Sequence, residues 1–292
     1  MIKEDTRNKI TSLLSDTLKE NIIYRSEQSL SGGDINEAYR IETDAGYFFV
    51  KLNSASRFPG MFEKEARGLS LLAKPAVIPV PEVILHGEAN DDSFLILQNI
   101  ESGSRASGFW DEFGKNLAKL HRNHAEAFGL KHDNYIGSLP QYNHQHPDWS
   151  SFFIEERLQR QLKMAVDAGR VDRSFNRAFD RLFLRMQEIF PEEPPALLHG
   201  DLWNGNFMVN EKGKACIIDP AVYYGHREMD LGMSKLFGGF ASEFYHAYND
   251  EFPLEKGWEK RVDICNLYPL MVHVNLFGGA YAASVKNILN HV

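Results

Sequence analysis

The sequence contains few cysteines and no long unbroken apolar run. Cys216 and Cys265 are its only cysteines, too few for a disulfide framework or a zinc ribbon. The longest apolar stretch, residues 267–283, is interrupted by a proline, a histidine and an asparagine, so we expect no membrane span. The charged first residues also lack the apolar core of a secretion signal. These absences predict a chain that works in the reducing cytoplasm, away from membranes.

The sequence also has fewer basic than acidic residues. The 292 residues include 32 Lys and Arg against 40 Asp and Glu, for a formal charge of −8 at pH 7. We therefore expect no general attraction to nucleic acid or to an anionic membrane, and a phosphorylated ligand would need a local positive pocket. The apolar share of 43% and the aromatic share of 12% are typical of a globular enzyme and exclude a disordered or fibrous chain.

The pattern of apolar residues predicts an α+β protein with two lobes. Strand-like runs and two helical stripes precede a polar segment, and a mainly helical pattern with one strand-rich island follows it. We predict a small lobe of antiparallel strands plus a helix at 1–98, a hinge at 99–103, and a larger, mostly helical lobe at 104–292. In the larger lobe, helices are expected at 109–122, 148–168 and 174–189.

One segment carries the residue types of phosphoryl transfer. Asp201, within His-Gly-Asp, and Asn206 reproduce the H-x-D-x-x-x-x-N spacing of the kinase catalytic loop, and Asp219 ends an apolar strand thirteen residues later. Phosphoryl transfer needs a carboxylate aimed at the acceptor hydroxyl and oxygen ligands that hold Mg²⁺ against the nucleotide phosphates. The spacing therefore favours a catalytic set over the alternative, a polar loop whose carboxylates cap turns by chance.

A lysine and a glutamate form a second constellation. Lys51 lies within the apolar run 48–52, where an ammonium group is costly to bury unless an opposite charge meets it. Glu65 follows fourteen residues later, on the apolar stripe of a predicted helix. A strand lysine paired with a helix glutamate fixes a cation over nucleotide phosphates in kinase folds, so we predict this ion pair. The alternative is an edge strand whose lysine reaches water, with Glu65 on the surface.

Two further features near these motifs each have two interpretations. Gly32 and Gly33, followed by Asp34, form a turn whose backbone N–H groups could approach phosphate. The chain contains neither G-x-G-x-x-G nor G-x-x-x-x-G-K-[ST], so an ordinary hairpin turn is the alternative. Trp203, inside the catalytic segment, either stacks on a sugar face or anchors the loop as a core residue.

Two pairs of histidines have the spacing of metal ligands. These are His144 with His146, and His121 with His124. Neither pair has an acidic or third ligand at a fixed spacing, and His144 and His146 fall in a segment rich in Gln and Asn. The sequence therefore favours ordinary polar residues over a metal site at both places.

Taken together, these motifs resemble the fructosamine kinase (ketosamine-3-kinase) family, which is related to aminoglycoside and choline phosphotransferases and has a protein-kinase-like fold. The resemblance runs from about Ile22 to Leu289. H-G-D alone marks only the wider group, whereas H-G-D-L-W-N-G-N with the C-terminal L-F-G-G is much more specific. The matching residues lie within 32–39, 49–51, 62–66, 117–121, 133–141, 148–153, 199–206, 219–228, 230–240 and 267–279.

The resemblance assigns roles residue by residue. It implies Asp201 as the catalytic base and Asn206 and Asp219 as the Mg²⁺ ligands. Lys51 would hold the nucleotide phosphates, with Glu65 as its partner. The D-P-A that begins at Asp219 stands where protein kinases have D-F-G, so a switch based on a flipping phenylalanine should be absent.

Other assignments concern the surroundings of the site. Gln98, Asn99 and Ile100 resemble the hinge whose backbone meets adenine, and Asp230 resembles the acid that braces the catalytic loop. Asp34 stands where some relatives have a cysteine, so we expect no thiol-based redox control through the glycine turn.

The activity implied is that of an ATP- and Mg²⁺-dependent kinase acting on a ketosamine such as fructosamine or ribulosamine. The phosphoryl group would go to a sugar hydroxyl, O3, of a small-molecule or protein-bound adduct, in deglycation repair. The alternative is a phosphotransferase for an aminoglycoside, choline or a similar amino alcohol. A catalytically dead nucleotide-binding module would have lost Asp201, Asn206, Asp219 or Lys51, and all four are present.

Overall fold

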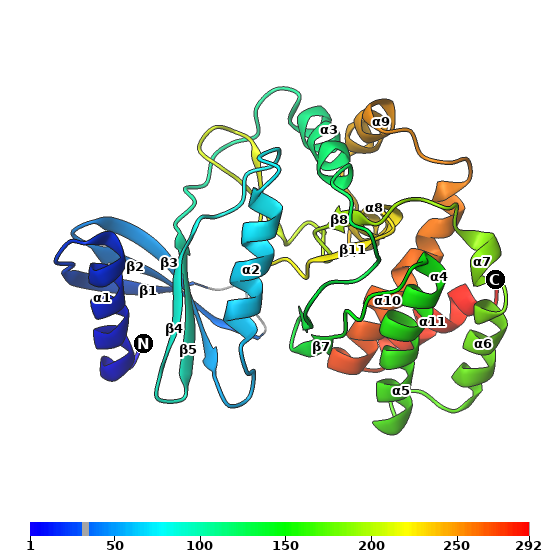
Figure 1. The fold of residues 1–292 in the computed structure, drawn as a ribbon, viewed down its shortest axis with the longest axis horizontal. Coiled ribbons are helices and arrows are strands. Elements are labelled where there is room, and N and C mark those ends of the chain that lie inside the picture. Colours follow the sequence, from blue (N-terminus) through cyan, green and yellow to red (C-terminus); the bar gives the residue numbers. More distant parts are fainter. Residues whose placement is uncertain (31–34, 292) are drawn as a thin grey trace. The chain divides into compact units, whose positions relative to one another are not determined.

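The computed structural model describes residues 1–30 and 35–291 (Figure 1). The predicted glycine turn, with Gly32, Gly33 and Asp34, lies outside these residues. The α+β class expected from the sequence is confirmed, because an antiparallel sheet and many helices are both present.

Two compact units make up the chain. The first contains residues Met1–Ala106 and Met208–Ile218, and the second contains Ser107–Phe207 and Asp219–Val292. The boundaries predicted from the sequence, with a hinge at 99–103, stay a prediction.

The first unit is built on a five-stranded antiparallel sheet in the order β1-β2-β3-β5-β4. Helices α1 (Glu4–Leu18) and α2 (Met61–Ala73) lie on opposite faces of this sheet (Figure 1). A hairpin of β9 (Phe207–Val209) and β10 (Ala215–Ile217) also pairs here, through the Ile217 amide and the Pro79 carbonyl. The sheet strands are β1 (Tyr24–Leu30), β2 (Glu37–Thr43), β3 (Gly46–Ser54), β4 (Val83–Ala89) and β5 (Asp92–Gln98).

The alternation of side chains along β3 separates the two faces of the sheet. Val50 is fully buried in the same apolar cluster as Ile10 and Leu14 of α1. The next side chain, Lys51, points to the opposite face and meets Glu65 of α2. One strand thus builds the core on one face and positions a charged group on the other.

The second unit is mainly helical. Its apolar core joins residues from most of its helices, with Phe152, Phe153, Phe179 and Met271 fully buried. Two short antiparallel strand pairs belong to it: the hairpin of β6 (Asn134–Ile136) and β7 (Leu139–Gln141), and β8 (Ala196–Leu198) paired with β11 (Tyr223–Gly225). The helices are α3 (Phe109–His121), α4 (Trp149–Phe152), α5 (Gln159–Asp167), α6 (Ser174–Phe183), α7 (Met186–Ile189), α8 (Glu228–Leu236), α9 (Ser242–Glu251), α10 (Trp258–Phe277) and α11 (Ala280–Leu289).

Two helices expected as continuous are interrupted. The predicted helix at 148–168 consists of α4, a π-helical turn at Phe153–Leu158 and α5. The predicted helix at 174–189 divides into α6 and α7 at the exposed Leu184. Apolar residues on both sides of each break belong to the same buried core, so their pattern alone does not reveal the interruption.

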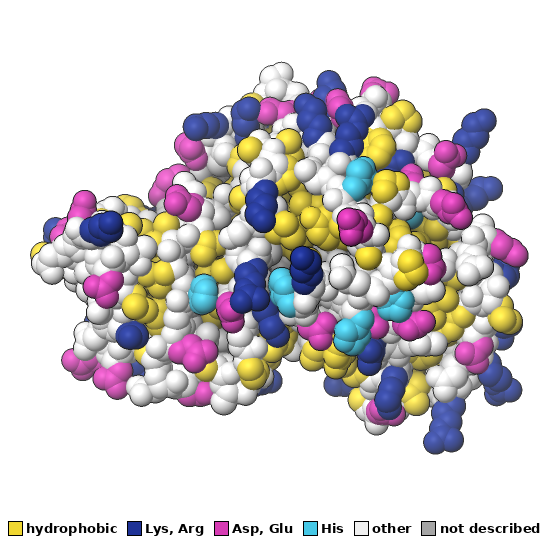
Figure 2. All heavy atoms as spheres, in the orientation of Figure 1, with side chains coloured by type: hydrophobic (Ala, Val, Ile, Leu, Met, Phe, Trp, Pro, Cys, Tyr) yellow, Lys and Arg dark blue, Asp and Glu magenta, His cyan; other side chains and the backbone are white. Residues whose placement is uncertain are grey.

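No helix within the described residues is long and apolar enough to cross a membrane. The longest, α10, contains Pro269. On the face that Figure 2 shows, acidic and basic side chains are interspersed rather than gathered by sign.

Candidate active site

The H-G-D segment follows directly on a buried strand of the second unit. All of β8 is buried, and the chain leaves the sheet at His199. Gly200 has a φ of +85°, and a Cβ there would lie 2.0 Å from the carbonyl oxygen of Ala221, so only glycine fits. The Ala221 amide donates to the His199 carbonyl at 2.9 Å. The catalytic segment and the residues after Asp219 are therefore held together.

Asp230, on α8, braces this loop. Its carboxylate accepts hydrogen bonds from the backbone N–H groups of His199 (2.7 Å) and Gly200 (2.9 Å). His121 Nε2 lies 3.2 Å from the same carboxylate, and the other ring nitrogen lies 2.9 Å from the Tyr248 hydroxyl. Burial alone would raise the pKa of Asp230, but the hydrogen bonds from His121 and the backbone outweigh burial and lower it. A buried, fully engaged carboxylate of this kind orients a loop and does not react.

Asp201 is held by Asn206, five residues later in the same loop. The Asn206 amide nitrogen donates to the Asp201 carbonyl at 2.8 Å and to its Oδ2 at 2.9 Å. The pKa of Asp201 is raised to about 7, mainly by burial and also by the charges of Asp219 and Asp230, while the Asn206 hydrogen bond opposes the rise. The side chain is nevertheless half-buried rather than enclosed, as a base that meets a substrate has to be.

Asp219 occupies a strained backbone position. Its φ is +54°, a value that few non-glycine residues adopt. The segment that follows is fixed by two side-chain amides of the β6–β7 hairpin. Gln141 donates to the Ala221 carbonyl at 3.0 Å, and Asn134 donates to the Val222 carbonyl at 2.9 Å. A strained backbone position that neighbouring hydrogen bonds hold in place in this way is typical of a functional site.

The donor atoms of Asn206 and Asp219 suit a magnesium ion. Because the Asn206 nitrogen is directed at Asp201, the amide oxygen is its remaining ligand atom. A carboxylate and an amide oxygen are hard ligands of the kind that Mg²⁺ prefers. The charge of Asp219 also raises the pKa of Asp201, so the two carboxylates repel each other, and a divalent cation would relieve that repulsion.

Trp203 packs against its own loop. Its ring meets Phe237 edge to face, with centroids 5.7 Å apart and planes at 74°. A Cβ on Gly205 would come within 2.4 Å of the indole, so glycine is what lets the ring fold over the loop. The ring is half-buried. Both interpretations of this tryptophan therefore have a structural basis, because the loop holds the ring and leaves part of it exposed.

In the first unit, the ion pair expected between Lys51 and Glu65 is present. Lys51 Nζ lies 2.7 Å from Glu65 Oε1, and the two side chains are only 7% and 11% exposed. Gln98 ends β5, and its amide donates to the Glu82 carbonyl at 2.8 Å. Asn99 and Ile100 follow outside the sheet, and the Asn99 side chain donates to Glu101. These contacts do not test whether Gln98, Asn99 and Ile100 meet adenine.

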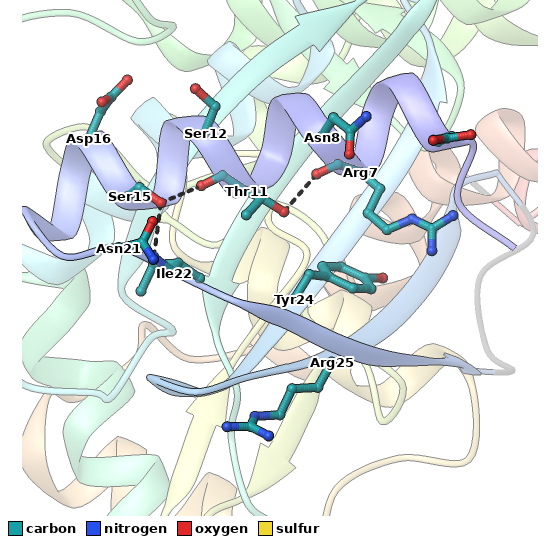
Figure 3. A pocket seen from close by; sticks show the side chains of 11 residues that line it. Arg7, Asn8, Thr11, Ser12, Ser15, Asp16, Asn21, Ile22, Tyr24 and Arg25 are labelled. Atoms are coloured by element: carbon teal, nitrogen blue, oxygen red, sulfur yellow. Dashed lines mark hydrogen bonds between the residues drawn. The ribbon is translucent and has the colours of Figure 1, made fainter.

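The first unit also contains an open hollow of about 700 Å³ between α1 and β1 (Figure 3). Two of its hydroxyl groups are already used, because Thr11 donates to the Arg7 carbonyl and Ser15 donates to the Thr11 carbonyl. Helix α1 lines it with both acidic and basic side chains, and β1 adds Arg25. It contains none of the residues that the sequence assigned to nucleotide or substrate.

Two sets of residues escaped the sequence analysis. The amides of Asn134 and Gln141 lie in a motif noted only for resemblance, and amide-to-carbonyl bonds leave no periodic pattern that would reveal them. The other set surrounds Glu156, whose Oε1 lies 3.2 Å from His144 Nδ1 and 3.5 Å from His146 Nε2. The histidine pair was expected to lack an acidic partner, but the fold supplies one from ten residues further along the chain.

The chain is similar to known proteins along most of its length. A model of the family described as fructosamine kinase matches residues 6–292. A probable ketoamine kinase of Enterococcus faecium is 40% identical over 266 residues, covering 89% of this chain and 92% of that protein. A chloroplastic protein-ribulosamine 3-kinase of Arabidopsis thaliana is 41% identical over 267 residues, covering 90% of this chain and 81% of that protein.

Solved structures give the same fold. A structure assigned as a fructosamine-3-kinase of Haemophilus somnus has a TM-score of 0.88 and 29% identity, covering 97% of this chain and 96% of its own. A thermostable mutant of the aminoglycoside phosphotransferase APH(4)-Ia, in a ternary complex with AMP-PNP and hygromycin B, has a TM-score of 0.62 over 97% of this chain and 98% of its own. At 16% identity, that second likeness concerns the fold alone.

Proposed function

The chain belongs to the fructosamine kinase family, and on this premise we propose that it transfers the γ-phosphoryl group of ATP to the O3 hydroxyl of a ketosamine. The observation that carries the proposal is the catalytic loop of the second unit. There Asn206 fixes the carboxylate of Asp201, and Asp230 fixes the backbone on which that carboxylate stands.

In this mechanism Asp201 takes the proton of the acceptor hydroxyl. The hydroxyl oxygen forms a bond to the γ-phosphorus while the bond from that phosphorus to the bridging oxygen breaks, and ADP leaves. A base works best when its pKa lies near the operating pH, and the pKa of Asp201 is raised to about 7. After the transfer, the proton passes from Asp201 to water.

Asn206 and Asp219 are the residues proposed to hold Mg²⁺. Bound between protein and nucleotide, the ion would neutralise charge on the phosphates. The chain's own contribution is to place two oxygen ligands with few degrees of freedom. The Asn206 amide is oriented by its bonds to Asp201, and the backbone of Asp219 is held by the braced segment after it.

For the nucleotide we propose a site in residues 1–98 and the hinge at 99–103, with the catalytic lobe at 104–292. Lys51 would meet the phosphates, because its ion pair with Glu65 holds the ammonium group in one direction while both side chains are buried. The further nucleotide-binding residues proposed are Gly32, Gly33, Gln98, Asn99 and Ile100.

For the acceptor we propose a sugar stacked on Trp203. A polar sugar has an apolar face, and a half-buried indole next to the base offers a surface for it. The product would be unstable. Once the C1 proton is lost, phosphate can leave C3, and water can then hydrolyse the resulting imine to release the amine. Removal of a glycation adduct in the cytoplasm, from a free or a protein-bound amine, is the role proposed for this chemistry.

The proposal is tested by a panel of acceptors. With ATP and Mg²⁺, we expect ADP to form with a ribulosamine or a fructosamine, and no faster than background with kanamycin or choline. Turnover of kanamycin or choline without turnover of any ketosamine would overturn the proposal. Omitting Mg²⁺ should abolish the reaction, and retention of full activity in EDTA would remove the metal from the mechanism.

A further inference from the structure

The cluster around Glu156 is distinct from the catalytic loop and independent of the proposed kinase reaction. We propose that His146, Glu155 and Glu156, with His144 as a fourth donor, bind a divalent transition metal of the zinc type. One ligand atom from each of His146, Glu155 and Glu156 lies within 4.8 Å of the others. His144 lies on the same oxygen of Glu156.

Two of the distances match the edge of a zinc tetrahedron. With metal–ligand bonds of about 2.0–2.2 Å, tetrahedral ligand atoms lie about 3.4 Å apart. Oε1 of Glu156 is 3.2 Å from His144 Nδ1 and 3.5 Å from His146 Nε2. Without a metal, protons on the imidazole rings can occupy these contacts, so binding would replace hydrogen bonds by coordinate bonds. Glu155 is exposed and can turn toward the ion.

Two of the donors are fixed before any ion arrives. His146 exchanges backbone hydrogen bonds with Phe128, at 3.0 and 3.1 Å, and its ring packs edge to face on Phe152. Its side chain is only 15% exposed. The carboxylate of Glu156 is 4% exposed, although a buried carboxylate is costly unless charge or hydrogen bonds compensate it. A rigid pair of this kind loses little entropy when it binds a metal.

Glu155 and Glu156 both lie in the π-helical turn at Phe153–Leu158. Their ligand atoms fall in one group with that of His146, although Glu155 is exposed and Glu156 is buried. Single π turns inside helices occur frequently at functional sites.

The charges and donor types select the class of ion. Arg160 lies 3.5 Å from the other oxygen of Glu156, so it compensates part of the negative charge without occupying Oε1. One glutamate charge then remains for the ion. Imidazole nitrogen with carboxylate oxygen suits Zn²⁺, Ni²⁺ or Co²⁺, whereas Mg²⁺ prefers oxygen alone. The site should therefore ignore the Mg²⁺ that serves the kinase reaction.

The test is a titration of the untagged full chain with Zn²⁺ alone, in excess Mg²⁺ and without nucleotide. We expect one Zn²⁺ per chain and a rise in the melting temperature, because the ion would link the loop at 142–148 to the π-helical turn at Phe153–Leu158. His146→Gln should weaken binding by at least about 10- to 100-fold and abolish the rise. Glu155→Gln, which changes an exposed side chain, should also weaken binding. The matched control is His246→Gln, an exposed histidine on α9, which should bind as the parent does.

A variant that has lost zinc binding can be distinguished from one that has failed to fold. Melting temperatures measured in EDTA show whether a variant is intact before zinc is added. Co²⁺ in place of zinc should give the strong visible absorption of tetrahedral cobalt in the parent and lose it in His146→Gln. If the parent takes up no zinc, or if intact His146→Gln and Glu155→Gln bind it as tightly as the parent, the proposal is wrong.

Discussion

The carboxyl group of Asp201 combines a raised pKa with a fixed direction. Burial and two neighbouring carboxylates favour its neutral form, while Asn206 donates a hydrogen bond to it. The result suits a group that must take a proton near neutral pH and release it again. Such an environment also costs stability, so the chemistry and the fold make opposite demands on this residue.

The role of the base predicts a loss of turnover in Asp201→Asn. Without a proton acceptor, kcat should fall by about 10²–10⁴-fold, while nucleotide affinity hardly changes. Asp219→Asn is the matched comparison, since it should instead weaken Mg²⁺-dependent nucleotide binding. Steady-state kinetics with a nucleotide titration separates the two. An Asp201→Asn enzyme that loses ATP binding but keeps kcat at saturation would contradict the assignment.

The raised pKa also predicts that Asp201→Asn stabilises the protein free of metal and nucleotide. A carboxyl group with a folded pKa near 7 holds its proton more tightly when folded than when unfolded, where its pKa is about 3.8. Its stabilising contribution is complete at low pH and is lost as pH rises through this window. Asn cannot ionise and avoids that loss.

Thermal melts at about pH 5 and about pH 8 check this expectation. The melting temperature of the variant should exceed that of the parent at the higher pH, and the gap should shrink at the lower one. Asp16→Asn, at an exposed position on α1, is the control and should show no such trend. A gap that stays constant with pH would show that Asp201 is not the titrating group.

Gly205 offers a test of Trp203 that leaves the tryptophan in place. A methyl group at Gly205 would press on the indole, which a Cβ would approach to 2.4 Å. If the ring stacks on sugar, Gly205→Ala should raise KM for a ketosamine about 2- to 10-fold with little change in melting temperature. Trp203→Leu should act in the same direction.

If Trp203 instead anchors its loop as a core residue, we expect the opposite result. Truncating a core tryptophan to Ala costs about 3–5 kcal/mol. Kinetics and thermal melts therefore distinguish the two roles of Trp203 when they are measured on Gly205→Ala, Trp203→Leu and Trp203→Ala. A collapse in melting temperature with KM unaltered would assign Trp203 to the core.

At the scale of the elements, α8 connects the catalytic loop to the rest of the second unit. It presents Asp230 to the loop, and its first residue, Glu228, is 1% exposed and paired with Arg261 of α10. The guanidinium contacts both carboxylate oxygens, at 2.7 and 2.5 Å. Burial raises the pKa of Glu228 and the Arg261 hydrogen bonds counteract part of that rise. This buried ion pair thus links α8 to α10, in addition to the contacts of Asp230.

Removing one partner of this pair should destabilise the protein markedly. Arg261→Met leaves a buried, unpaired carboxylate, which costs about 3–5 kcal/mol. Denaturant unfolding measures the loss. The double variant Arg261→Met with Glu228→Gln should regain much of it, because no charge is left unpaired. Equal stability of the parent and Arg261→Met would show that the pair does not hold α8.

The elements differ in how well the sequence predicts them. Lys51 and Glu65 were predictable because each is a charge in an apolar pattern, and such charges need each other. Leu184 and the π turn were not, since apolar residues on both sides of each break belong to the same buried core. Glu156 lies close to His144 and His146 only in the folded chain, so no fixed spacing in the sequence predicts the contact.

At the scale of the whole molecule, some features were predictable from residue patterns and others only from the family resemblance. The α+β class followed from the alternation of strand-like and helical patterns, and family membership followed from H-G-D-L-W-N-G-N. Neither pattern measures where one lobe ends, and the boundaries at 98 and 104 remain predictions. The choice of O3 likewise comes from the family, because side-chain spacing cannot identify the acceptor oxygen.

The position of the transferred phosphoryl group is the most direct test of the account. The protein should be incubated with ATP, Mg²⁺ and a carbon-labelled ribulosamine or fructosamine, and the product followed by phosphorus and carbon NMR. We predict a single monophosphate coupled to C3 that decays to inorganic phosphate and the unmodified amine. The Asp201→Asn protein should form it far more slowly. A stable phosphate on another carbon, or no transfer to any ketosamine, would contradict the account.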